Sequence, residues 1–244
     1  MQIELSEFLY FSLFETFYAL YFVSACIKAA GVWSLVQTIT SKKTCAGISI
    51  GSQRLILIAS LGRFVSLFYF EHGLYQLVEA IGIAGVVVTN YLIHTKYHVT
   101  YEKVYDTFRI EFLLVPAVLL SLVLHVDSSG PAVVDILWTF SVYLESVALF
   151  PQIFLISRTN NIENLTKHYI GALGVSRILE MVFWLYISFK TMHVMTWIPT
   201  YMAAASLVVG LSNLVHTVLL SDFLWKYLKS VKLSVKGILP TSMV

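Results

Sequence analysis

Apolar segments long enough to cross a membrane recur along the whole of this 244-residue chain. A helix needs about 20 mostly apolar residues to span the hydrocarbon core of a bilayer. The sequence predicts seven spans, at residues 17–40, 53–70, 77–93, 108–124, 133–156, 169–189 and 197–224. Because 58% of the residues are hydrophobic and the connections are short, no separate water-soluble domain is expected. We therefore predict one polytopic all-α membrane domain over residues 1–244, with 1–16 as an N-terminal extension and 226–244 as a tail.

The lysines and arginines in the connections and at the ends of the spans are divided unequally between the two sides of the membrane. Twelve of them lie in the connections 41–54, 94–109 and 157–168 and in the tail, whereas the opposite side has only Lys190. By the positive-inside rule, the side with twelve is cytosolic. This predicts a lumenal N-terminus and a cytosolic C-terminus. The basic excess is thus a topology signal, and we expect membrane lipid but no nucleic acid as a partner.

Ionisable residues lie inside four of the predicted spans: Lys28, Arg63, Glu145, Arg177 and Glu180. A charge at the centre of a bilayer costs at least about 2.5–3.5 kcal/mol, so such residues usually face a polar cavity. Arg177 and Glu180 share one helical face because they are three residues apart. Three cations and two acids predict a positively charged cavity that suits an anionic ligand such as a carboxylate. The alternative is that the charges pair and only hold helices together, with Glu145 bonded to Arg63 or Arg177.

Two tryptophans and a histidine are further candidates. Trp138 and Trp184 lie in the lumenal halves of their spans. They either line the mouth of the cavity or anchor the protein at the membrane interface. His216 lies inside the last predicted span and is a candidate proton sensor, because histidine titrates in the pH range of the secretory compartments. The sequence has no metal-ligand or nucleophile pattern, so we expect no metal, no cofactor and no enzymatic activity.

A dipeptide pattern suggests an internal repeat. Ser52-Gln53 and Pro151-Gln152 lie near the cytosolic ends of two spans, and the two glutamines are 99 positions apart. A proline inside a span removes one backbone hydrogen bond and bends the helix. With seven spans, this predicts two parallel three-helix repeats plus a linker helix, the PQ-loop or SWEET-like build of sugar transporters. A small-solute transporter is therefore an alternative function.

Several segments carry a resemblance to one known family. Residues 106–159 contain DTFRIEFLLVPAVLL and ILWTFSVYLESVALFPQIFLISRT, residues 45–49 read CAGIS, and residues 228–234 read LKSVKLS. These segments closely resemble the KDEL receptors, the endoplasmic reticulum (ER) lumen protein-retaining receptors, and the match runs from about residue 45 to 234. The family binds C-terminal Lys/His-Asp-Glu-Leu signals of escaped ER proteins in the acidic Golgi and returns them in coat-protein-I (COPI) vesicles. The resemblance implies these ligands, this coat, and ER and cis-Golgi membranes for this chain.

The resemblance also implies roles for individual residues in ligand binding. Arg63 stands where the family clamps the terminal carboxylate, and its planar guanidinium can bond both oxygens. Phe64 lies beside this clamp. Trp138 and Trp184 stand at positions that line the peptide path. Asp135 stands at a family acid near the first, basic residue of the signal.

Other positions correspond to conformational switching and to trafficking in the family. The switch network that responds to binding comprises Glu145, Ser176, Arg177 and Glu180. Asp222 stands at an acid linked to retrograde transport. Lys229 and Lys232 resemble a basic sorting motif for COPI.

The chain departs from the family pattern around the expected ligand. Tyr21 and Ile187 stand at arginines, Ser66 stands at an acid, and Lys28 stands at the pH-sensing histidine. We therefore expect capture of a terminal carboxylate but a less acidic signal, with Lys28 and His216 as candidate pH sensors. A trafficking paralogue that binds no peptide is the remaining alternative.

Overall fold

The computed structural model describes residues 2–70, 73–101, 103–125, 131–159, 164–193, 207–215, 217–218 and 221. Throughout these residues the regular structure is helical, and they contain no strand. The main helices are α1 (Gln2–Lys42), α2 (Ile50–Phe70), α3 (Leu74–Tyr91), α4 (Glu111–Val123), α5 (Ala132–Val147), α6 (Phe150–Thr159) and α7 (Asn164–His193). A π-helical turn, η1 (Leu92–Lys96), and a 3-10 turn, η2 (His98–Thr100), follow α3. Residues 207–215 add a further helical segment.

Four helical segments of the described chain are long and apolar enough to cross a membrane: Tyr18–Lys42, Leu74–Lys96, Ala132–Leu155 and His168–Tyr186. They coincide with the spans predicted at 17–40, 77–93, 133–156 and 169–189. Helices α2 and α4 coincide with the predictions at 53–70 and 108–124, and most of the seventh, 197–224, lies outside the described residues. The prediction of an all-α membrane protein is therefore confirmed.

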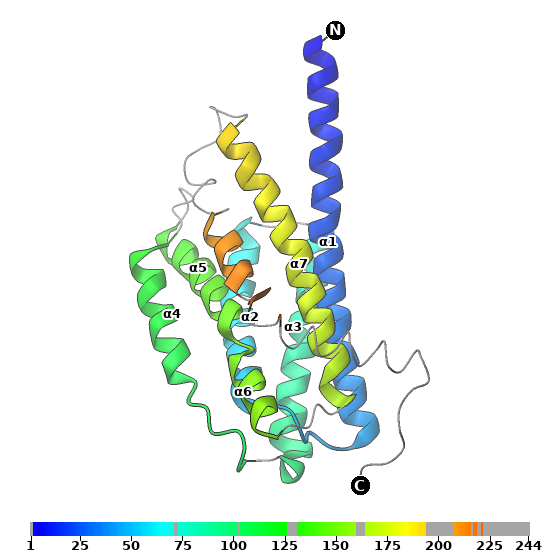
Figure 1. Cartoon of the computed structure of the whole chain (residues 1–244), viewed down its shortest axis with the longest axis vertical. Helices are drawn as coiled ribbons and strands as arrows, with labels where there is room; N and C mark the ends of the chain where they lie inside the picture. The colour runs from blue at the N-terminus through cyan, green and yellow to red at the C-terminus, as the bar shows by residue number, and fades with distance from the viewer. Residues whose placement is uncertain are drawn as a thin grey trace.

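Figure 1 shows the helices as a bundle from which α1 projects. We call the end that carries residues 70, 74, 123, 132 and 193 the upper end, which is at the top of the figure, and the opposite end the lower end. The predicted span 17–40 is only the lower part of α1, which has 41 residues. The helix begins earlier because residues 2–30 contain neither glycine nor proline to end it.

Helix α1 lies between α3 and α7, whereas α2 packs on α3 and α5, and α4 packs on α5. The lower half of the bundle has an apolar core that includes Leu35, Ile39, Ile93 and Ile170, each at most 1% exposed. Helices α1 and α7 approach closely at Gly31, where an added Cβ atom would lie 2.7 Å from the Cβ atom of Ala172. This packing holds the lower part of α1 against α7.

We expect Gly31→Ala to lower the free energy of unfolding by about 1–3 kcal/mol, because overpacking forces the two helices apart. The matched control is Gly62→Ala on α2, where the nearest atom to an added Cβ is 3.5 Å away. That control should be neutral or stabilising, since alanine favours helix over glycine by about 1 kcal/mol. Unfolding in mixed detergent micelles measures both variants, and equal stabilities would contradict the packing argument.

The predicted span 133–156 is two helices rather than one. Residues 148–149 form a turn between α5 and α6, immediately before Pro151. Proline has no backbone N–H to donate to the carbonyl four residues earlier, so the helix is interrupted and the chain bends there. The hydroxyl of Ser52 donates to the Ala148 carbonyl at 2.6 Å and satisfies one acceptor exposed by the break.

The two Gln-containing dipeptides lie at the lower end of the bundle, where they fasten the connection between α1 and α2. Gln152 is 1% exposed, and its Oε1 accepts from the backbone N–H of Ser49 at 2.8 Å. Its Nε2 donates to the Gly47 carbonyl at 2.8 Å. A single side chain of α6 thus satisfies both a donor and an acceptor of a buried turn.

Truncation of Gln152 should therefore destabilise the protein without touching the middle of the bundle. We expect Gln152→Ala to cost about 1–3 kcal/mol, because the Ser49 N–H is left buried without an acceptor. Gln37→Ala, at an exposed position of α1, is the control and should stay within about 0.5 kcal/mol of the wild type. Urea or detergent unfolding compares the two, and a Gln152 variant as stable as the control would refute this role.

The same connection is also held by Asp106. Its Oδ2 accepts from the Ile50 N–H at the start of α2 and from the Tyr101 hydroxyl, each at 2.8 Å, and its Oδ1 accepts from Ser49 Oγ at 2.9 Å. Burial and the hydrogen bond to Asp106 raise the pKa of Tyr101 above its usual range. Tyr101 therefore remains a neutral donor at cellular pH.

Candidate functional site

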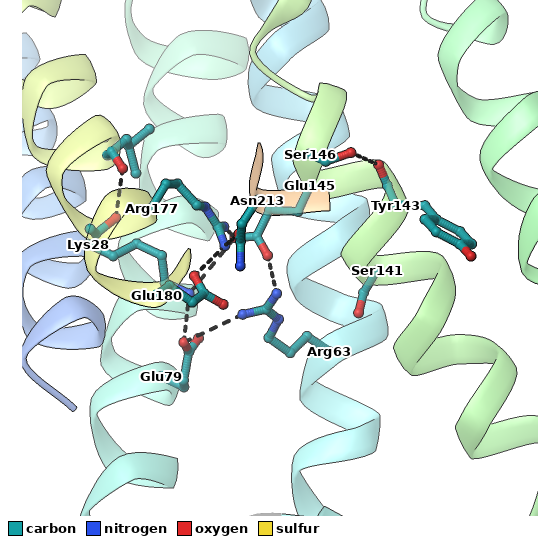
Figure 2. A network of polar contacts seen from close by, with 12 residues as sticks. Lys28, Arg63, Glu79, Ser141, Tyr143, Glu145, Ser146, Arg177, Glu180 and Asn213 are labelled. Atoms are coloured by element: carbon teal, nitrogen blue, oxygen red, sulfur yellow. Dashed lines mark hydrogen bonds and ion pairs between the residues drawn. The ribbon is translucent and has the colours of Figure 1, made fainter. Parts of the chain in front are cut away.

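Six charged side chains from five helices meet in the middle of the bundle (Figure 2). None of these side chains is more than 16% exposed. They are Lys28 of α1, Arg63 of α2, Glu79 of α3, Glu145 of α5, and Arg177 and Glu180 of α7. We call these six residues the charge cluster. With three cations and three carboxylates, the cluster has no net formal charge.

Direct ion pairs hold the cluster together. Lys28 Nζ lies 2.6 Å from Glu79 Oε1, and Arg177 Nη1 lies 2.6 Å from Glu180 Oε2. The two oxygens of Glu145 bond to different arginines, Oε2 to Arg63 Nη2 and Oε1 to Arg177 Nη2. Every cation of the cluster therefore already has a carboxylate partner.

Longer contacts link these pairs into one network. Arg63 Nη1 lies 3.9 Å from Glu79 Oε1, and Lys28 Nζ lies 3.8 Å from Glu145 Oε1. Arg177 Nη1 also donates to Asn213 Oδ1, at the long distance of 3.5 Å. Helices α1, α2, α3, α5 and α7 are thus connected through charged groups in the interior of the protein.

Glu79 is the member of the cluster that sequence reasoning missed. It lies near the start of the predicted span 77–93, between Val78 and Ala80. An acidic residue with apolar neighbours inside a predicted span could have identified it as a further buried charge. Because Glu79 supplies a third carboxylate, the prediction of a positively charged cavity is wrong for the described residues. The geometry agrees with the alternative prediction that the charges pair, and Glu145 pairs with both Arg63 and Arg177.

Four aromatic side chains, which we call the aromatic cluster, lie on the upper side of the charge cluster: Tyr21, Tyr75, Phe183 and Trp184. The ring of Tyr21 stacks on Tyr75 at 4.8 Å and on Phe183 at 4.7 Å, and Trp184 meets it edge-on at 6.1 Å. The Tyr75 hydroxyl donates to Glu79 Oε1 at 3.1 Å and lies 2.8 Å from the Tyr21 hydroxyl. Trp184 is therefore placed by packing inside the bundle.

The other residues predicted to bind a ligand are not all brought to the charge cluster. Phe64 is 36% exposed, and its ring contacts Phe68 at 5.1 Å. Asp135 is buried in the first turn of α5, and Trp138 is half-buried one turn further along that helix. Arg63 and Trp184 are thus the two predicted ligand-binding residues that belong to the charge and aromatic clusters.

Of the predicted switch residues, Glu145, Arg177 and Glu180 lie in the charge cluster. Ser176 is buried, and its hydroxyl donates to the Leu173 carbonyl of its own helix at 2.8 Å. Of the two pH-sensor candidates, Lys28 is in the cluster. The predictions for His216, Asp222, Lys229 and Lys232 fall outside the described residues.

A small cavity of about 40 Å³ lies beside the charge cluster, toward the lower end. Lys28, Glu79, Glu145 and Arg177 line it together with apolar residues and Tyr169. This volume has room for a few water molecules, since one water needs about 10–15 Å³ on this measure. Within the described part of the chain, no group of His, Cys, Asp or Glu side chains is arranged to hold a metal ion.

Comparison with known proteins gives consistent matches over most of the chain. The family model for the ER lumen protein retaining receptor matches residues 44–187. An ER lumen protein-retaining receptor of Drosophila melanogaster is 39% identical over 200 residues, which are 81% of this chain and 87% of the relative. Receptor 2 of Gallus gallus is 38% identical over 212 residues, which are 86% of this chain and 93% of the relative. The family match includes every member of the charge cluster except Lys28.

Proposed function

The chain belongs to the family of ER lumen protein-retaining receptors, and we propose that it binds the C-terminal retention signals of soluble ER proteins and returns those proteins to the ER. The observation that carries this proposal is the position of Arg63. Its guanidinium lies in the middle of the bundle and is bonded to a carboxylate, that of Glu145. A buried arginine is suited to grip a peptide's terminal carboxylate because its donors match both oxygens.

In this proposal Glu145 occupies the place of the ligand before the ligand arrives. A terminal carboxylate has the same two oxygens as the Glu145 side chain, so it can replace that side chain on Arg63 without new geometry. The displaced Glu145 keeps a partner, because Arg177 holds its other oxygen and Lys28 Nζ lies 3.8 Å from that same oxygen. Binding is thus an exchange of carboxylates, and Glu145, Arg177 and Glu180 form the network that responds to it.

The remaining parts of the proposal concern the path of the ligand and the route of the receptor. Trp184 and Trp138 line the approach from the upper end, and Asp135 contacts a basic side chain of the signal. The upper end is lumenal and the lower end cytosolic, as the twelve lysines and arginines on one side favour. The receptor cycles between ER and Golgi, with Asp222, Lys229 and Lys232 serving COPI-dependent return.

The proposed architecture is seven spans in two parallel three-helix repeats with a linker helix. Two features support it: α2 and α5 pack against each other, and the Gln53 and Gln152 side chains are both buried. Ser52 also bonds to the carbonyl of Ala148, close to the second dipeptide. In such a build, a ligand site between the repeats is expected.

A sugar-type transporter receives less support. Sites for small molecules usually have volumes of about 300–1,000 Å³. The cavity beside the charge cluster has only about 40 Å³ and is lined by four charged side chains, which suits water better than a sugar. A peptide would also exceed this cavity, so we retain the receptor function on the family match, which covers most of the chain.

Binding of C-terminal peptides to the purified full-length chain in nanodiscs tests the proposed function. We expect peptides with a free terminal carboxylate to bind and the same peptides with an amidated terminus to bind at least about tenfold more weakly, because an amide cannot form the charge-assisted bonds to Arg63. Equal binding of the two forms, or no binding of either, would contradict the proposal. Solute flux in proteoliposomes would then favour the transporter, and its absence would favour the trafficking paralogue.

A further inference from the structure

The lumenal side of the proposed topology has very few basic residues to offer a ligand. In the proposed topology, twelve of the sixteen lysines and arginines in the sequence are cytosolic and three belong to the charge cluster, so Lys190 is the only one expected on the lumenal side. The segments that the sequence predicts on or next to the lumenal side contain six acidic residues: Glu4, Glu7, Glu15, Glu71, Asp127 and Asp135. A negative potential therefore opposes the entry of acidic ligands and favours basic or neutral ones.

The charge cluster cannot compensate for this shortage. Each of its cations is paired with a carboxylate, and the six formal charges cancel. The terminal carboxylate of a ligand adds one negative charge, which exchange with Glu145 on Arg63 can accommodate. An acidic side chain would add a second negative charge to a buried site whose three cations already have carboxylate partners, and such uncompensated burial is strongly unfavourable.

The side chains packed between the charge cluster and the upper end are largely aromatic and buried. Tyr21 and Phe183 are 8% and 6% exposed, and their stacked rings join α1 to α7. Tyr75 joins α3 to the same stack, and its hydroxyl bonds to Glu79. In the proposed approach from the upper end, a peptide whose terminal carboxylate reaches Arg63 would have to open this stack and pack its preceding side chains against these rings. Apolar and amide side chains are compatible with this surface, whereas carboxylates lose their hydration there without gaining a cation.

We propose that this chain selects C-termini in which the terminal carboxylate is the only negative charge, with apolar or amide side chains at the preceding positions. The inference rests on the proposed function and adds the chemical class of the ligand. In this proposal the neutral charge cluster, the acidic lumenal side that the sequence predicts and the aromatic cluster determine the specificity together. Discrimination of this kind arises from rejecting the wrong ligand as much as from attracting the right one.

Three peptides that differ only in their last residues test the proposed class of ligand. They end in Lys-Asp-Glu-Leu, in the isosteric Lys-Asn-Gln-Leu and in Lys-Phe-Gln-Leu, each as free acid and as amide, and their dissociation constants are measured on the full-length chain in nanodiscs of neutral lipid. We expect the two neutral free acids to bind at least about tenfold more tightly than the Asp-Glu peptide. Tighter binding of the Asp-Glu free acid would overturn this inference and leave the proposed function standing. If no free acid binds better than its amide, the proposed function fails and the inference with it.

A substitution in the aromatic cluster gives an independent test. Tyr21→Arg places a cation beside the stack, and we expect it to improve binding of the Asp-Glu free acid at least about tenfold relative to the Asn-Gln free acid. Tyr21→Phe is the matched control and should leave the ratio unchanged, because it keeps the ring and adds no charge. Phe183→Arg introduces the cation from α7 instead of α1, should the first variant not fold. An unchanged ratio in a folded arginine variant would overturn the role given to the aromatic cluster.

Discussion

Replacing Arg63 by glutamine should lower the free energy of unfolding by about 3–5 kcal/mol, because the cluster would keep three carboxylates and only two cations in the interior. The same change combined with Glu145→Gln should recover most of that loss. Two ion pairs remain in the double variant, Lys28 with Glu79 and Arg177 with Glu180. Each has a nitrogen-to-oxygen distance of 2.6 Å and includes neither of the substituted residues. Charge balance, more than any single bond, is thus expected to stabilise the middle of the bundle.

Unfolding in mixed detergent micelles, followed by circular dichroism, measures this pattern. Arg54→Gln is the control on the same helix, because Arg54 is exposed, and it should change the free energy of unfolding by no more than about 0.5 kcal/mol. A single Arg63 variant as stable as the control would show that the cluster contributes little to stability. If the double variant Arg63→Gln/Glu145→Gln were less stable than the single variant Arg63→Gln, charge balance would not be the governing factor.

Glu145→Gln should have opposite effects on stability and on ligand binding. It removes the carboxylate bonded to Arg63, so a free-acid peptide no longer has to displace it. A charge-assisted hydrogen bond contributes about 1.5–3 kcal/mol, which corresponds to an affinity gain of about tenfold or more. Stability should fall at the same time, because Arg63 and Arg177 both lose a partner.

Titration of the folded Glu145→Gln variant with peptide tests the proposed exchange of carboxylates on Arg63. The amidated peptide should show no comparable gain, since it carries no carboxylate for Arg63. Glu111→Gln at the exposed start of α4 removes the same charge elsewhere and should leave the affinity unchanged. Weaker binding of the free acid to Glu145→Gln would mean that Glu145 assists the ligand and does not compete with it.

The features that could be predicted from sequence are those that depend on one helix at a time. Hydropathy over about 20 residues predicts membrane helices well, because every backbone group in lipid must be bonded within its own helix. The pairing of Arg177 with Glu180 follows from a spacing of three residues. The break between α5 and α6 lies beside Pro151, as the missing N–H requires.

The features that could not be predicted depend on how helices face one another. Lys28 and Glu79 are 51 residues apart and lie on different helices, so only the packing of α1 on α3 brings them together. The prediction counted Lys28 without Glu79, so the cluster has no net formal charge where an excess of positive charge was expected. The stacking of Tyr21 on Phe183 is equally a result of tertiary packing. Local sequence placed each of these residues in a helix and left its partner undetermined.

The most direct test of the account is the affinity of one free-acid C-terminal peptide and its amide for two chains, wild type and Arg63→Gln/Glu145→Gln. The paired variant keeps the charge balance, so loss of binding cannot be attributed to an uncompensated charge. We predict that the wild type prefers the free acid by at least about tenfold and that the paired variant has no preference. A paired variant that still prefers the free acid would show that another group receives the carboxylate and would contradict the role of Arg63.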